Sequence, residues 1–171
     1  ALSVHRQPPL VVAMPGNTEE AAAVLRVCRE EGVPVVTRGA GTGLSGGALP
    51  LANGVLLNMS RMNRILKIDR DNRLARVQPG VRNLQISEAV ADLGLYYAPD
   101  PSSQIACSIG GNVAENAGGV HCLKYGLTVH NVAAVEVLTI DGERLTLGSE
   151  APDAPGYDLL AFIHGSEGLL A

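Results

Sequence analysis

Two glycine-rich stretches carry the residues whose chemistry is easiest to interpret. The first, residues 39–47, follows an apolar run at residues 33–37, and the second covers residues 110–126. Together they hold ten of the twenty glycines. Because glycine has no Cβ, its N–H groups can approach a ligand closely, and a glycine-rich loop after a strand offers donors suited to phosphate. Two such loops predict one large ligand held at two places, with a dinucleotide cofactor as the leading candidate.

The first stretch contains a GxGxxG pattern at Gly41, Gly43 and Gly46. A Rossmann site needs a helix that begins inside this motif, but Pro50 follows too soon for one. The next carboxylate, Asp69, lies 28 residues after Gly41 instead of about 20. No Lys-Ser/Thr pair follows the motif, so a P-loop is also excluded. The remaining alternative is a surface loop without a ligand, and the agreement of two loops argues against it.

Composition narrows the class of partner. The 171 residues are 46% hydrophobic and 18% charged, which suits one domain with a core or two small subdomains that share one. The net charge of −4 and the absence of tryptophan argue against nucleic-acid binding. We therefore expect backbone dipoles, with Arg38, to hold an anionic cofactor. The apolar run at residues 132–137 contains Glu136 and is too short for a transmembrane segment.

Other chemically active side chains give weaker signals. Cys107 and Cys122 are interpreted as core or loop residues, because neither has an evident base partner. His121 has no second pair of ligands, so no metal site is predicted, and no catalytic residue is assigned. Three cysteines without CxxC spacing and no secretory leader favour a reducing, cytoplasmic location.

The elements that must position the loops begin as a βαβ unit. Residues 10–13 form an expected strand, Asn17 caps a helix with Glu20 three residues on, Gly32 ends that helix, and residues 33–37 form the next strand. Asn83 is expected to cap a helix that ends at Gly94. Further strands are expected at residues 55–57, 65–68, 74–77, 132–140 and 143–147, the last two joined by a two-residue Asp141-Gly142 hairpin, with a helix within 158–163. This pattern predicts an α+β domain.

Several segments together resemble the vanillyl-alcohol-oxidase / p-cresol-methylhydroxylase (PCMH) family. Residues 34–47, PVVTRGAGTGLSGG, resemble its first FAD-binding segment, and residues 77–81, VQPGV, the strand end that follows. Residues 99–119 with Tyr125-Gly126 resemble the second segment. The resemblance covers essentially the whole chain. It implies a PCMH-type FAD-binding fold of two α/β subdomains, about residues 1–80 and 81–171, with the flavin between them.

The same resemblance implies which residues bind the cofactor. The pyrophosphate loop would be Arg38, Gly39, Ala40, Gly41, Thr42, Gly43, Leu44, Ser45, Gly46 and Gly47. The flavin and its ribityl chain would lie along Pro79, Gly80, Val81, Ser102, Ser103, Ser108, Ile109, Gly110, Gly111, Asn112, Asn116, Ala117, Gly118 and Gly119, with Val137 at the pyrimidine edge. Relatives that attach FAD covalently through the first loop place a histidine there, so Thr42-Gly43 predicts non-covalent FAD.

The function implied is that of a flavin-dependent dehydrogenase of a small 2-hydroxy acid, glycolate or D-lactate. The family continues past a Gly-Ser-Glu-Gly segment into a substrate-binding cap, whereas this chain shows residues 165–168 and ends at Ala171, so it is expected to be a fragment without the cap. Expected partners are flavoprotein and iron–sulfur subunits, which would place the protein in the cytoplasm or at the inner face of a membrane. The alternatives are a dehydrogenase of another hydroxy acid, such as 2-hydroxyglutarate or a sugar acid, and a partner subunit without catalysis.

Overall fold

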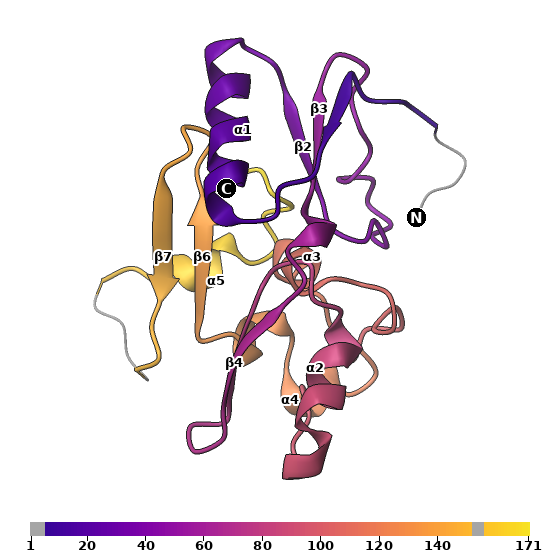
Figure 1. Cartoon of the computed structure of the whole chain (residues 1–171). Coiled ribbons are helices and arrows are strands. Elements are labelled where there is room, and N and C mark those ends of the chain that lie inside the picture. Colours follow the sequence, from indigo (N-terminus) through magenta and orange to yellow (C-terminus); the bar gives the residue numbers. More distant parts are fainter. Residues whose placement is uncertain (1–5, 152–155) are drawn as a thin grey trace.

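The computed structural model describes residues 6–151 and 156–171 (Figure 1). Its first sheet is parallel and contains β1 (Val11–Ala13), β2 (Val35–Arg38) and β3 (Val55–Asn58) in the order β1-β3-β2. Val55, Leu56 and Leu57 are buried, as expected for the central strand of a parallel sheet. The strands β1 and β2 are parallel, as the predicted βαβ unit requires, but β3 lies between them.

Helix α1 (Thr18–Glu30) connects β1 to β2 and has the predicted cap. The side chain of Asn17 accepts a hydrogen bond from the Glu20 N–H at 2.9 Å, while the Glu20 carboxylate accepts one from the Gly16 N–H at 2.7 Å. The helix buries Ala21, Ala22, Leu25 and Cys28. Gly32 follows it with φ +64°, so the predicted helix end is confirmed.

Two antiparallel hairpins follow, β4 (Ile65–Asp69) with β5 (Leu74–Val77) and β6 (Ala134–Leu138) with β7 (Arg144–Gly148). The predicted two-residue turn between β6 and β7 is wrong. Thr139 donates to the Glu143 carbonyl at 2.9 Å, which leaves residues 140–142 as a three-residue loop. Gly142 has φ +75°, and a glycine in this conformation is the usual last residue of such loops.

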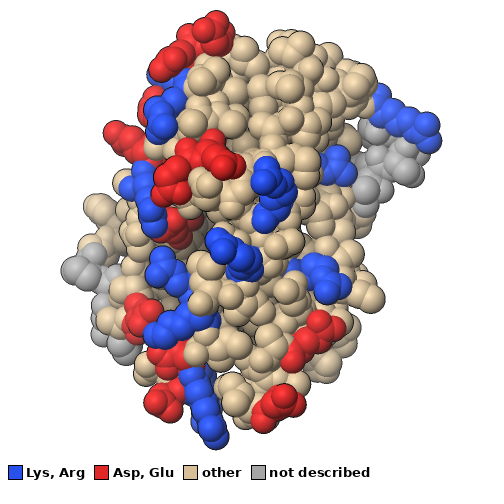
Figure 2. Space-filling model, viewed as in Figure 1, with Lys and Arg blue, Asp and Glu red and all other residues tan. Residues whose placement is uncertain are grey.

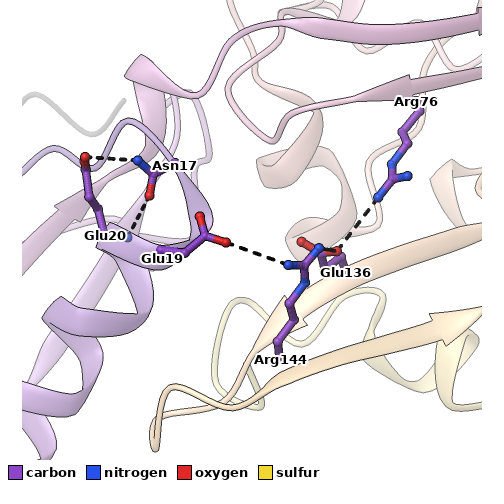
Figure 3. A network of polar contacts seen from close by, with 6 residues as sticks. All are labelled: Asn17, Glu19, Glu20, Arg76, Glu136 and Arg144. Carbon is purple, nitrogen blue, oxygen red and sulfur yellow. Dashed lines mark hydrogen bonds and ion pairs between the residues drawn. The ribbon is translucent and has the colours of Figure 1, made fainter.

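Ion pairs link both hairpins to the start of α1 (Figure 3). Arg144 of β7 pairs with Glu136 of β6 and approaches Glu19 of α1 at 3.9 Å. Arg76 of β5 approaches Glu136 at 3.9 Å. Arg76, Arg144 and Glu19 are largely exposed, so each pair contributes little to stability. These pairs connect β5 to β6, and they connect β7 to both β6 and α1.

Helix α2 (Asn83–Val90) continues into a 3₁₀ turn, η2 (Ala91–Leu93), and ends at Gly94 with φ +69°. The prediction that Asn83 caps this helix is wrong, because Arg82 occupies the cap position. The Asn83 side chain is buried, and its Nδ2 donates to the Pro99 carbonyl at 3.0 Å. The amide therefore fixes a distant loop instead of its own helix terminus.

The second glycine stretch contains helices that the sequence did not indicate. They are α3 (Ile109–Glu115) and α4 (Cys122–Tyr125), and the 3₁₀ turn η3 (Thr128–Asn131) follows them. Elsewhere in the chain, the 3₁₀ turn η1 (Met59–Arg61) follows β3. Helix α5 (Leu159–Ile163) confirms the last expected helix. Glycine disfavours helix, which hid α3. A buried cluster of Val81, Ile86 and Ile109 joins α2 to α3. Within residues 6–151 and 156–171, no helix has the length and apolar character needed to cross a membrane.

Candidate cofactor-binding site

The two glycine-rich stretches meet along α3. Ser108 immediately precedes this helix, and its Oγ accepts a hydrogen bond from the Ala40 N–H at 3.3 Å. Glu115 is the last residue of the helix, and both of its carboxylate oxygens lie 3.2 Å from the Ser45 Oγ. The first glycine loop therefore runs along α3 and contacts both of its ends, so segments about 70 residues apart form one site.

The backbone donors of the first loop point to a ligand. In the part of the chain that the structure describes, no N–H group from Gly41 to Gly47 donates a hydrogen bond to the protein. Gly41 has φ +70° and Gly46 φ +90°, conformations that other residues adopt only with strain. A stretch of free backbone donors held in this way can bind an anion such as a diphosphate.

Arg38 provides a positive charge beside these donors. A Cβ built on Gly41 would lie 2.5 Å from the Arg38 Nη2 and 2.7 Å from its Nε, so the guanidinium lies directly against the loop. Figure 2 shows Lys and Arg side chains spread over the visible face among acidic ones, without a single large basic field. A phosphate bound by this loop would therefore depend on local donors more than on overall charge.

The predicted segment at residues 79–81 covers the first turn of α3. The Ile109 N–H donates to the Val81 carbonyl at 2.8 Å, and the Gly110 N–H donates to the Pro79 carbonyl at 2.9 Å. Gly80 fits against backbone, because a Cβ there would lie 2.5 Å from the Met59 carbonyl oxygen. This close packing places residues 79–81 and residues 108–111 in one rigid unit.

Asp100 joins the two parts of the second predicted segment. Its Oδ1 accepts from the His121 N–H at 3.3 Å, and its Oδ2 lies 2.5 Å from the His121 Nδ1. The hydrogen bond from the His121 side chain lowers the pKa of Asp100. Gly119 lies so close to the Asp100 backbone that no Cβ would fit there. Ser103 accepts from the Cys107 N–H at 2.8 Å within the same loop, whereas Ser102 is exposed.

Residues 112–119 surround the other end of α3. Asn112 is buried, and its Nδ2 has no hydrogen-bond partner among the described residues. Asn116 has φ +48°, and its Oδ1 accepts from the Val129 N–H at 3.0 Å. Ala117 accepts two hydrogen bonds from Thr128, through its N–H at 3.0 Å and its Oγ1 at 2.7 Å. Asn116 and Ala117 thus bind the chain itself, and Asn112 keeps a free donor.

One predicted site residue belongs to another part of the fold. Val137 lies in β6 opposite Leu145, and none of the contacts described above involves it.

A cavity of about 350 Å³ lies beside the second segment. It includes no residue of the first glycine loop, and its lining is Ser87, Tyr96, Tyr97, Ala98, Asp100, Gln104, His121 and Tyr125. Burial raises the pKa of Tyr97 to about 12.

Sequence reasoning missed three side chains that organise the site. Asp100 and His121 carried a visible signal, since each lies beside a glycine-rich or Pro-Ser-rich motif. Glu115 carried none, because its contact with Ser45 spans 70 residues. Among residues 6–151 and 156–171, no three His, Cys, Asp or Glu side chains gather in a group that could hold a metal ion.

Comparison with known proteins identifies the fold. A family model described as "FAD binding domain" matches residues 9–148. The chain belongs to this FAD-binding family. FAD is therefore its cofactor, and the free donors of residues 41–47, the Arg38 guanidinium and the unpartnered Asn112 amide fit a large anionic ligand.

The chain is also similar to curated relatives. It is 69% identical over 169 residues to glycolate oxidase subunit GlcD of Escherichia coli K12, a match that covers 99% of this chain and 34% of the relative. It is 41% identical over 163 residues to a D-lactate dehydrogenase of Anaerostipes hadrus, covering 95% and 34%. The chain thus spans about a third of the length of these relatives.

A solved structure gives the same answer for the fold. Alkyldihydroxyacetonephosphate synthase superimposes with a TM-score of 0.77 at 25% identity, over 92% of this chain and 28% of that one. The predicted α+β, PCMH-type FAD-binding fold is confirmed.

Proposed function

We propose that this chain is the cofactor-binding part of a flavin-dependent 2-hydroxy-acid dehydrogenase that oxidises glycolate or D-lactate. The observation that carries this proposal is the 69% identity to a glycolate oxidase subunit over 99% of the chain. The similarity to a D-lactate dehydrogenase supports D-lactate as the second substrate. Flavoprotein and iron–sulfur partner subunits, and a division near residue 80 into two subdomains with the flavin between them, belong to the same proposal.

In this proposal the first glycine loop binds the diphosphate of FAD. The backbone N–H groups of residues 41–47 are free to donate, and the Arg38 guanidinium adds charge at the Gly41 end. The Asn112 amide is a buried donor for the flavin or its ribityl chain. The other residues proposed to line the cofactor are those of segments 79–81, 102–103, 108–111 and 116–119, with Val137 assigned on resemblance alone.

Bound flavin supplies a hydride acceptor at N5, and a base must take the proton of the substrate hydroxyl. In the proposed site, residues of this chain would bind and orient the cofactor, and the hydrogen bonds from Ile109 and Gly110 to Val81 and Pro79 hold residues 79–81 against the start of α3. No base is assigned within the described residues. We propose that it belongs to the part of the protein outside these 171 residues, together with the substrate-binding groups.

The test compares Gly41→Val with Gly32→Val in the full-length protein. Both glycines have positive φ, +70° and +64°, so the two substitutions impose similar backbone strain. Only Gly41 lies in the proposed loop, whereas a Cβ at Gly32 meets nothing within 4 Å. We expect Gly41→Val to abolish flavin retention and dye reduction with glycolate and D-lactate, while Gly32→Val keeps both. Undiminished flavin content in Gly41→Val would refute the proposed loop, and wild-type protein that holds flavin but turns over neither acid would refute the substrate.

A further inference from the structure

We propose that Glu115 is a positioning residue for the cofactor, because its carboxylate holds the first glycine loop in place through the Ser45 hydroxyl. This inference rests on the proposed FAD site. The Ser45 Oγ lies 3.2 Å from both Glu115 oxygens. A Cβ on Gly43 would lie 3.1 Å from the Glu115 Oε1, so the glycine leaves room for the carboxylate. Glu115 therefore contacts the loop midway along its free donors.

The tether begins on a rigid element. Four backbone hydrogen bonds fix the last turn of α3, two from the residues that follow it and two from the segment after α5. The Asn116 and Ala117 N–H groups donate to Val113 and Asn112 at 3.2 and 2.9 Å. The Gly165 and Glu167 N–H groups donate to Val113 and Ala114 at 3.0 and 2.8 Å. A side chain on this turn can order the loop, because the N–H groups of residues 41–47 make no hydrogen bonds to the described residues.

Glu115 is expected to affect FAD affinity in two opposite ways, because its hydrogen bond orders the loop while its negative charge disfavours the diphosphate. A carboxylate beside a loop that binds an anionic diphosphate repels the ligand, although its exposure to solvent screens this repulsion. At the Gly41 end, the Arg38 guanidinium attracts the same ligand. Two effects of opposite sign can be separated, because glutamine keeps an oxygen that accepts the Ser45 hydrogen bond but removes the charge.

The experiment is a double-mutant cycle on FAD affinity, measured by titrating full-length apoprotein with FAD and following flavin fluorescence. We expect Glu115→Ala and Ser45→Ala each to weaken binding about five- to tenfold, as for loss of one ordering hydrogen bond. The double variant should bind no more weakly than either single variant. Glu115→Gln should bind at least as tightly as the wild type. Glu30→Ala, at the last residue of α1, is the control for loss of an exposed helix-terminal carboxylate.

Each contrary outcome has a distinct meaning. If Glu115→Ala binds FAD like the wild type while Gly41→Val loses it, the positioning role is wrong and the proposed cofactor site stands. If Gly41→Val also keeps FAD, the proposed site itself is wrong. Additive losses in the double variant, or a Glu115→Gln variant as weak as Glu115→Ala, would overturn the tether through Ser45.

Discussion

Replacing Gly80 by alanine should destabilise the chain, because the added Cβ would collide with backbone atoms. The new Cβ would lie 2.5 Å from the Met59 carbonyl oxygen and 2.8 Å from the Met62 carbonyl oxygen. Neither obstacle is a side chain that can rotate away. Overpacking of this kind costs about 1–3 kcal/mol. To relieve this overlap, residue 80 must move away from Met62, which weakens the 2.8 Å hydrogen bond from its N–H to the Met62 carbonyl. Such a hydrogen bond contributes about 1 kcal/mol. We therefore expect the free energy of unfolding to fall by about 3 kcal/mol.

The measurement is urea unfolding of the 171-residue chain, followed by circular dichroism. With a urea dependence of about 2 kcal/mol per molar, the midpoint should fall by roughly 1.5 M. Gly111→Ala is the matched control, because its Cβ meets only the Ser108 Oγ at 3.3 Å and alanine favours the helix that contains it. A Gly80→Ala midpoint equal to that of the wild type or of Gly111→Ala would refute the reasoning.

Two further predictions concern the cofactor and the Asp100–His121 pair. Acid precipitation of the full-length protein should release all flavin into the supernatant, because the first loop has no histidine to attach it; coloured protein in the pellet would show covalent attachment, with Cys107 as the first residue to examine. The pKa of Asp100 is lowered in the folded state, chiefly by the His121 hydrogen bond. The Asp100 carboxylate therefore stabilises the fold above the ordinary aspartate pKa of about 3.9. This stabilisation is lost as the pH falls through the lowered pKa of the folded state. Asp100→Asn should therefore lower the urea midpoint at neutral pH and match the wild type in strong acid; a difference that does not change with pH would contradict this assignment.

The sequence predicted the parts of the fold that depend on local chemistry. Strand β1, helix α1 and strand β2 follow from apolar runs, the Asn17 cap and the Gly32 stop, all within a few residues of the element they define. The structure brings the two glycine stretches together, because the Ala40 N–H donates to the Ser108 Oγ. That these stretches bind the phosphates of one ligand stays a prediction.

Long-range contacts decided what the sequence could not show. Asn83 has the side chain of a helix cap, but a buried bond to Pro99 uses it elsewhere. Helix α3 contains two adjacent glycines that argue against helix, yet the approach of Gly110 to Pro79 requires a residue without Cβ. The role of Glu115 depends on a partner that no local pattern connects with it.

The tethers of the first glycine loop also set an order of events during synthesis. The Ser108 and Glu115 side chains that hold the loop lie 68 and 70 residues after their partners Ala40 and Ser45. At about 5–20 residues per second, the ribosome completes β2 and its loop roughly 3 to 14 s before Glu115 is added. During that interval the nascent loop has its glycines but no helix to arrange them. Insertion of FAD should therefore be a late step of biogenesis, and slow assembly of α3 would delay it even where the N-terminal βαβ unit has already folded.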